Sequence, residues 1–316
     1  MKNSIKLIKK AKKIAIFSHK SPDPDTIGSS LALYNALIFI GKQVDLYCDD
    51  DMQVDCMFLN GYTNYNTIEL NNNYDLIIAV DIASETMLGK FDEYFKQNID
   101  KSLRIDHHSS GTNFASHNLV VPFSACSLLI YKLLLKLKVK ITPEIATMLY
   151  FAICGDTGLF RNNNTDAKTF EVCAKLLKLG ADIKKVYSEF FDKKTVSYVK
   201  LTSNILLKAE VNDEHKYVIM TATKNDFDKF NATGRESIGN LANTYLNCGY
   251  NIAVTLKEAD DGIHCSFRSK FEYDCSKLAE VFGGGGHKNA SGCLINADLK
   301  SAKKQIETEI IKFFNA

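Results

Sequence analysis

Short apolar runs alternate with helix-like segments over the first 160 residues, and this alternation restricts the possible folds more than any other feature. The apolar runs, which predict strands, lie at residues 14–18, 43–48, 76–81 and 103–106. Helical periodicity lies between or after them, at residues 26–41, 84–97, 124–137 and 143–154. Such alternation predicts a parallel sheet with helices on both faces. We therefore expect an α/β domain over residues 1–165.

The rest of the chain predicts a helical connector and a second, smaller α/β domain. Residues 166–208 are helical in pattern, and we place the domain boundary near residue 195. In residues 209–316, strands are predicted at 217–221, 252–257, 263–268 and 293–296, and helices at 237–246, 276–281 and 299–314. A chain of 316 residues also exceeds what one hydrophobic core usually holds.

Aspartates and histidines gather where the predicted strands of the first domain end. They are His19, Asp23, Asp25, Asp81, Asp106, His107, His108 and, further on, Asp156. Parallel sheets bind ligands beyond the carboxyl ends of their strands. Carboxylates and imidazoles are ligands of hard or borderline divalent metals, and a pair of such ions about 3.5–4 Å apart is common in phosphate ester hydrolysis.

Each of these residues has a plainer explanation when taken alone. A strand-end aspartate often caps a helix or a turn, as Asp25 could, and a single buried histidine is usually structural. However, three of the seven histidines lie at these strand ends: His19, His107 and His108. A fourth, His287, directly follows the glycine run at residues 283–286. The doublet also follows an aspartate directly. The combination therefore favours a metal centre over separate structural roles.

The order H-x-x-P-D-x-D-x-x-G-S, D, D-H-H and G-D-T-G resembles that of the DHH phosphoesterases. The later R-S and G-G-G-H-x-x-A-S-G segments resemble their accessory DHHA1 domain. The resemblance covers essentially the whole chain. It is greatest to the two-domain branch of nanoRNases (oligoribonucleases) that are also pAp phosphatases, together with enzymes that split linear di-adenylate or cyclic di-AMP. This family architecture implies an active site in the cleft between the two domains.

The resemblance implies two divalent ions, with manganese expected first and magnesium or cobalt as alternatives. The implied ligands are His19 and Asp23 for one ion, Asp25, His107 and Asp156 for the other, and Asp81 for both. The implied catalytic residues are Asp81, His108, which would meet the scissile phosphate, and Asp106, which would orient the doublet. A water between two such ions loses its proton near neutral pH and becomes the nucleophile.

The predicted substrate residues lie in the second domain. Arginine can grip a phosphate with two parallel hydrogen bonds, and consecutive glycines let backbone N–H groups approach an anion. A glycine run alone is more often a flexible loop. With the resemblance, the residues expected to bind the non-scissile phosphate and base of a nucleotide are Arg268, Ser269, Gly284, Gly285, Gly286 and His287.

Composition limits the kinds of partner and the cellular setting expected for this protein. The formal net charge of +2 gives no global basic field, so long duplex nucleic acid is not expected. Nine cysteines without a CxxC pair indicate a reducing, cytoplasmic setting, and no apolar run approaches the ~20 residues of a membrane span. Relatives often pair, so a homodimer is compatible with the family, although no sequence feature demands it.

We expect a manganese-dependent hydrolase that degrades short RNA or DNA oligonucleotides such as pApA to nucleoside 5′-monophosphates and converts pAp to AMP. The class is that of phosphodiesterases and 3′–5′ exoribonucleases on short chains, with the direction of attack left open. A cyclic di-AMP phosphodiesterase is the alternative, because it would use the same metal centre. A non-catalytic nucleotide-binding sensor is a second alternative, but loss of ligands would mark it and all six are present.

Overall fold

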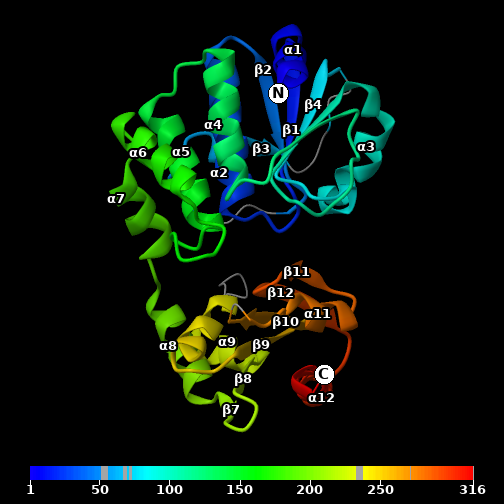
Figure 1. The fold of residues 1–316 in the computed structure, drawn as a ribbon, viewed down its shortest axis with the longest axis vertical. Coiled ribbons are helices and arrows are strands. Elements are labelled where there is room, and N and C mark those ends of the chain that lie inside the picture. Colours follow the sequence, from blue (N-terminus) through cyan, green and yellow to red (C-terminus); the bar gives the residue numbers. More distant parts are fainter. Residues whose placement is uncertain (51–55, 67–69, 71–72, 233–237, 271, 316) are drawn as a thin grey trace. The chain divides into compact units, whose positions relative to one another are not determined.

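The computed structural model describes the chain except for residues 51–55, 67–69, 71–72, 233–237, 271 and 316. It contains two compact units, Met1–Lys193 and Lys194–Ala316. In Figure 1 the colours follow the sequence, from blue at the start of the first unit to red at the end of the second.

The first unit contains a six-stranded sheet in which every pairing is parallel, with the order β3-β2-β1-β4-β5-β6. Its strands are β1 (Lys13–Phe17), β2 (Gln43–Tyr47), β3 (Tyr65–Asn66), β4 (Leu76–Val80), β5 (Ser102–Asp106) and β6 (His117–Val120). The four predicted strands are confirmed as β1, β2, β4 and β5. Sequence patterns missed β3 and β6 because both are short edge strands without a continuous apolar run.

The helices of the first unit are α1 (Lys2–Lys10), α2 (Pro24–Phe39), α3 (Asp92–Gln97), α4 (Cys126–Leu137), α5 (Pro143–Asp156), α6 (Ala167–Lys178) and α7 (Ile183–Val186). Short turns of other helix types are η2 (Tyr62–Asn64), η3 (Glu85–Phe91), η4 (Ile99–Lys101) and η5 (Tyr187–Phe191). The predicted helix at 84–97 begins as the 3-10 turn η3, because Gly89 has a non-helical backbone (φ 60°, ψ −132°).

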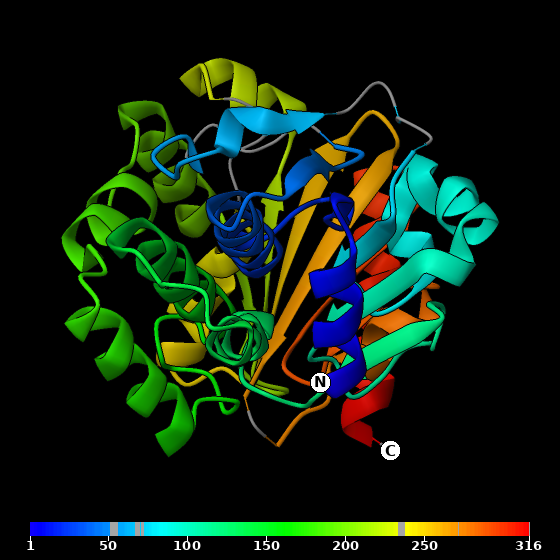
Figure 2. The ribbon, with the colours of Figure 1, turned by 90° about the horizontal axis from the view of Figure 1, so that it is seen from above.

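Side chains alternate along the buried strands, so each face of the sheet has its own core. Ile14 and Ile16 of β1 pack with α2, α4 and α5 on one face. Ala15 and Phe17 pack on the other face, against η3 and α3. Figures 1 and 2 show α2 and α3 on opposite sides of the sheet. The predicted α/β fold with helices on both faces is confirmed.

The second unit contains a mixed six-stranded sheet with the order β11-β12-β10-β9-β8-β7, in which only β8 and β9 are parallel. The strands are β7 (Glu210–Asn212), β8 (Tyr217–Ala222), β9 (Ile252–Ala259), β10 (Gly262–Ser269), β11 (Gly285–His287) and β12 (Ala290–Ile295). The helical elements are α8 (Val196–Leu207), α9 (Lys224–Phe230), η6 (Gly239–Leu241), α10 (Ala242–Asn247), α11 (Ser276–Val281) and α12 (Leu299–Asn315).

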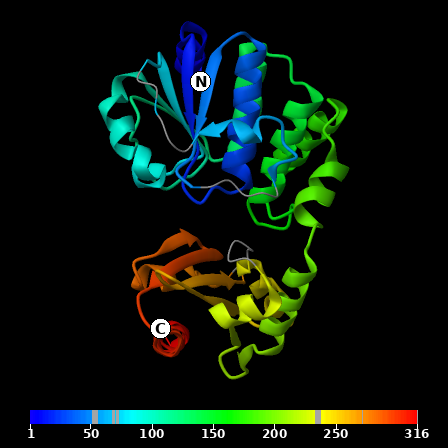
Figure 3. The same ribbon diagram turned by 180° about the vertical axis from the view of Figure 1, so that it is seen from behind.

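This second sheet also has two covered faces. One core contains Phe267 of β10 and residues of α11 and α12, and the other contains Val218 of β8 and residues of α8 and α10. Figure 3 shows α12, in red, apart from the yellow helices α9 and α10. The helix predicted at 237–246 is found as η6 followed by α10, although Ser237 itself lies outside the described residues. No helix among the described residues is long and apolar enough to cross a membrane.

Candidate metal centre

The candidate metal residues lie at the carboxyl ends of three neighbouring strands. His19 follows β1, Asp81 follows β4, and Asp106 ends β5. The sheet order places β4 between β1 and β5, so these strand ends are adjacent in space. The strand order also reverses between β1 and β4, and such a reversal is where open α/β sheets bind their ligands.

Asp81 adopts a backbone conformation that is unusual for its residue type. Its φ is 61°, in the left-handed region that few non-glycine residues occupy. Its N–H still donates to the carbonyl of Ile105 at 2.9 Å, which continues the pairing of β4 with β5 for one more residue. Conformations of this kind concentrate at functional sites, where the surrounding structure holds them in place.

Helix α2 supplies two carboxylates through its first turn. Asp23 caps the helix, because its Oδ1 accepts the backbone N–H groups of Asp25 and Thr26 at 2.9 and 3.0 Å. Asp25 has a different role. Its carboxylate accepts the N–H groups of Cys126 and Ser127 at 2.6 and 3.2 Å, at the start of α4. The helix-cap explanation therefore holds for Asp23, while Asp25 joins α2 to α4 beside the centre.

Asp81 lies between two groups of candidate ligands. Its Oδ1 is 3.4 Å from His107 Nε2, and its Oδ2 is 4.0 Å from His19 Nε2. Around His107 Nε2 are also Asp156 Oδ2 at 3.7 Å and Asp25 Oδ2 at 3.8 Å. Donors that share one ion at bonds of about 2.1 Å lie about 3–4 Å apart. These spacings therefore fit ligands of a common cation.

Three groups of residues offer ligand atoms that all lie within 4.8 Å of one another. They are His19 with Asp23 and Asp81, Asp25 with His107 and Asp156, and Asp81 with His107 and His108. The structure thus brings together all six residues predicted as ligands, and Asp81 belongs to two of the three groups. Its Oδ1 is buried and accepts no hydrogen bond, which is unusual for a carboxylate and is explained by a cation.

The two histidines present the same ring nitrogen to the centre. His19 Nδ1 lies 2.7 Å from the carbonyl oxygen of Lys20, and His107 Nδ1 lies 2.9 Å from that of Phe123. A carbonyl can only accept, so Nδ1 carries the proton in both rings. In the neutral ring Nε2 then keeps a lone pair, which is the form that binds a metal.

Burial and neighbouring carboxylates raise the pKa of Asp81 and of Asp156. Burial first, and then the charges of Asp25 and Asp23, raise the pKa of Asp81 well above its ordinary value. Burial and the charge of Asp25 raise the pKa of Asp156 to about 8. Without cations these groups resist ionisation together, whereas two divalent ions would supply the missing positive charge. The mixed oxygen and nitrogen donor set fits a hard or borderline divalent metal.

Asp106 and His108 form a separate pair beside the ligands. His108 Nδ1 lies 2.8 Å from Asp106 Oδ1, and Asp106 is fully buried. The other carboxylate oxygen accepts from the guanidinium of Arg104. Burial opposes ionisation of Asp106, but its bond to His108 and the charges of His108 and Arg104 lower its pKa. Asp106 is therefore an ionised acceptor that fixes the orientation of the His108 ring.

The predicted substrate residues of the second unit come from three adjacent strands. Arg268 of β10 pairs with Ala290 of β12, which in turn pairs with His287 of β11. Residues directly opposite one another point to the same face of a sheet, so Arg268 and His287 share a face. The run expected as a loop forms the edge strand β11 at Gly285–His287, and its residues are exposed.

Two of the three predicted glycines lie so close to neighbouring backbone atoms that a side chain would not fit. A Cβ on Gly284 would lie 2.1 Å from the carbonyl oxygen of Gly292. Gly286 has φ +140°, and a Cβ there would lie 2.7 Å from the carbonyl oxygen of Ala290. Ser269 is engaged locally, because its hydroxyl donates to Tyr273 O at 2.7 Å and accepts from Asn289 at 3.0 Å. Ser269 therefore stabilises the turn next to Arg268.

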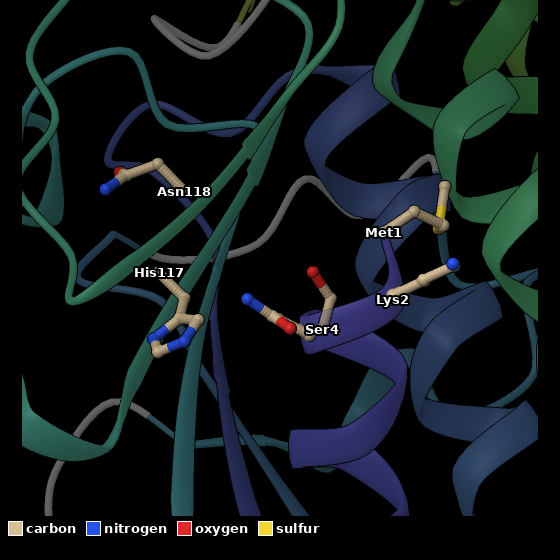
Figure 4. Close-up of a pocket in the computed structure, with 6 residues that line it drawn as sticks. Met1, Lys2, Ser4, His117 and Asn118 are labelled. Carbon is tan, nitrogen blue, oxygen red and sulfur yellow. The ribbon is translucent and has the colours of Figure 1, made fainter.

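A separate cavity of about 240 Å³ lies at the other end of the first sheet. Its lining comes from the start of α1 and the start of β6, with Ser4, His117 and Asn118 around it (Figure 4). Because β6 is parallel to β5, its first residue lies at the end opposite the strand ends that hold the candidate metal residues. This cavity is not part of the candidate centre.

Comparison with known proteins agrees with this geometry. Residues 13–153 match the DHH family, N-terminal domain, and residues 215–315 match the DHHA1 domain. Together the two matches cover most of the chain, which therefore belongs to the DHH family and carries a DHHA1 domain. The resemblance drawn from the motifs is confirmed.

Individual relatives are similar over nearly the full length of this chain. The bifunctional oligoribonuclease and PAP phosphatase NrnA of Thermus thermophilus is 29% identical over 93% of this chain and 87% of its own. The cyclic-di-AMP phosphodiesterase GdpP of Geobacillus thermodenitrificans is 26% identical over 98% of this chain and 48% of its own. The crystal structure of an exopolyphosphatase-related protein from Bacteroides fragilis superimposes with a TM-score of 0.92, at 26% identity, over 99% of this chain and 96% of that one.

Sequence reasoning missed two contributors to the site. Arg104 was read only as part of a predicted strand, and the available signal was a charged residue inside an otherwise apolar run. The carbonyl of Phe123 was missed because a backbone acceptor has no signature in sequence.

Proposed function

We propose that this protein is a metal-dependent phosphoesterase that hydrolyses short oligonucleotides such as pApA to nucleoside 5′-monophosphates and also converts pAp to AMP. The observation that best supports this proposal is the position of Asp81, whose two carboxylate oxygens face two separate groups of candidate ligands. The proposed ligands are His19 and Asp23 for one ion, Asp25, His107 and Asp156 for the other, and Asp81 for both. The proposed metal is manganese, with magnesium or cobalt as alternatives.

Two bound ions would supply an activated water and would polarise a phosphoryl oxygen. The residues of the chain do the rest. Asp81 fixes the spacing of the two ligand groups, because one rigid carboxylate belongs to both. His108 keeps the proton on Nδ1 toward Asp106. Its Nε2 can therefore exchange a proton or a hydrogen bond with the phosphate or with the leaving oxygen.

The second unit would bind the substrate and determine the length of oligonucleotide that the enzyme accepts. Arg268 is half-buried, and a phosphate that pairs with its guanidinium would make a strong, charge-assisted contact. His287 lies on the same face, two strands away. The formal charge of +2 supports short substrates over long ones.

A turnover assay in MnCl2 tests the proposal with four substrates: pApA, a longer RNA, pAp and cyclic di-AMP. Fast cleavage of pApA and pAp, with loss of both in Asp81→Ala, is the expected result. The similarity to GdpP supports a second candidate, and preference for cyclic di-AMP would select it. Tight nucleotide binding without turnover of any substrate would contradict an enzyme and indicate the sensor.

The nine cysteines are all free thiols, which supports action in a reducing compartment such as the cytoplasm.

A further inference from the structure

Arg104 is a buried cation next to the candidate centre. It lies on β5, two residues before Asp106, and is only 2% exposed. Buried charges are rare and unfavourable unless they are paired and hydrogen-bonded. The position of Arg104 therefore calls for an explanation beyond packing.

The guanidinium makes three directed contacts. Nε donates to the carbonyl oxygen of Ile82 at 2.7 Å, and Nη1 donates to that of Thr112 at 2.7 Å. Nη2 donates to Asp106 Oδ2. The Phe114 ring lies beneath the group, with its centroid 5.5 Å from Cζ. Only the rigid fork of arginine can reach all three acceptors at once, because a lysine offers one compact ammonium group.

These contacts join two loops that carry the reacting residues. Ile82 directly follows Asp81, and Thr112 lies in the loop that begins with His107 and His108 and runs to β6. The loops also meet directly, because Thr112 N–H donates to Ala83 O at 3.0 Å. Gly111 lies at this junction, where a Cβ would be 2.2 Å from Ala83 O and 3.2 Å from Arg104 Nη2. No larger residue fits without moving the backbone of Ala83, whose carbonyl the Thr112 N–H contacts.

Arg104 also acts on His108 through Asp106. The arginine holds Oδ2 of the carboxylate, which leaves Oδ1 for His108 Nδ1 at 2.8 Å. Asp106 therefore has one orientation, and the ring of His108 follows it. One side chain thus restrains both the carboxylate shared by the ligand groups and the histidine expected at the phosphate.

We infer that Arg104 is a positioning residue, which sets the relative placement of Asp81 and His108 before the metals and substrate bind. This inference rests on the proposed function. Loss of the guanidinium should weaken manganese binding and lower kcat about 10- to 100-fold each, the range found when groups that orient metal ligands are removed. KM should change little, because the contacts of Arg104 are with Ile82, Thr112, Asp106 and Phe114, none of which is a predicted substrate residue.

The first measurement needs no turnover. Manganese affinity is measured by electron paramagnetic resonance for the wild type, Arg104→Lys, Arg104→Met and the control Lys101→Met, which removes a positive charge at η4 outside the contacts described. Weaker binding in both Arg104 variants with an unchanged control is expected. Wild-type affinity in Arg104→Met would overturn the inference, even if the protein proved to have no activity on any nucleotide.

The second measurement separates positioning from folding. Arg104→Ala leaves space for a free guanidinium ion, so millimolar guanidinium chloride should restore part of kcat, while sodium or ammonium chloride at equal ionic strength should not. Arg104→Met and Asp106→Asn should not have additive effects on kcat, since they interrupt one chain of contacts. Additive losses without rescue would overturn the inference and leave the proposed function in place, because the wild type would still turn over pApA.

Discussion

The two carboxylate oxygens of Asp81 face two different histidines. Oδ1 lies 3.4 Å from His107 Nε2, and Oδ2 lies 4.0 Å from His19 Nε2. Since His19 follows β1 and His107 follows β5, the residue after the central strand β4 lies between candidate ligands from the strands on both sides. The spacing of the two ligand groups therefore depends on one side chain whose backbone has the unusual φ of 61°.

Replacement of Asp81 by asparagine should abolish turnover while the fold persists. The amide keeps the shape of the carboxylate but lacks its charge, so both ligand groups lose an anionic donor. Removal of several kcal/mol of transition-state stabilisation lowers kcat on the order of 10³-fold or more. Turnover of pApA is measured beside the control Asp100→Asn, an exposed residue of η4. Near wild-type kcat in Asp81→Asn would exclude the shared-ligand role.

The metal-free protein should lose stability as the pH rises from about 5 to about 8. Burial and the charge of Asp25 raise the folded-state pKa of Asp156 to about 8, from an ordinary value of 3.8. The folded state therefore binds more protons than the unfolded state throughout this interval, and the free energy of unfolding falls as the pH increases. The pKa of His107 is also raised, chiefly through the charges of Asp25 and Asp156 acting against burial, and it contributes with the same sign.

Thermal unfolding of chelator-treated protein measures this effect, with and without added MnCl2. The Tm gained on adding metal should increase with pH, because the ions replace the bound protons. Asp156→Asn should flatten the pH dependence of the metal-free protein. A Tm that rises steadily with pH in the absence of metal would contradict the assigned pKa shifts.

Loss of Arg268 should affect substrate binding more than chemistry. A hydrogen bond to a charged group contributes about 1.5–3 kcal/mol, so Arg268→Met should raise KM for pApA roughly 10- to 100-fold, with a smaller change in kcat. The matched control is His264→Ala, at an exposed position on the same strand and the same face. Steady-state kinetics of both variants decides the matter, and an unchanged KM in Arg268→Met would remove this residue from the binding site.

Gly28→Ala should destabilise the first unit, because α2 approaches α5 closely at this position. An added Cβ would lie 2.6 Å from Met148 O and 2.8 Å from Ala152 Cβ. Overpacking of this kind costs about 1–3 kcal/mol, which urea unfolding can measure. Gly285→Ala is the control for stability, since its Cβ would meet no atom within 4 Å. Equal unfolding midpoints for the two variants would contradict the packing argument.

The sequence predicted the α/β fold and its main strands because buried parallel strands are continuous apolar runs. The candidate ligands could also be predicted from the sequence, since His19, Asp81 and His107 lie at the ends of those runs or directly after them. The edge strands β3 and β6 carried no such signal. The glycine run was expected as a loop, whereas residues 285–287 pair with β12. Contacts through the backbone were the least predictable, because the carbonyl of Phe123 could belong to any residue type.

The bonds of Asp25 to α4 come from the backbone N–H groups of residues 126 and 127, not from their side chains. Substitution at these two positions would therefore leave the link intact for almost any amino acid whose side chain fits. Proline is the exception, because it has no N–H to donate. Although proline is favoured at the first position of a helix, Cys126→Pro would leave Asp25 without its shortest contact. At the start of α4, burial therefore limits the size of the side chain, and the link to Asp25 excludes proline alone.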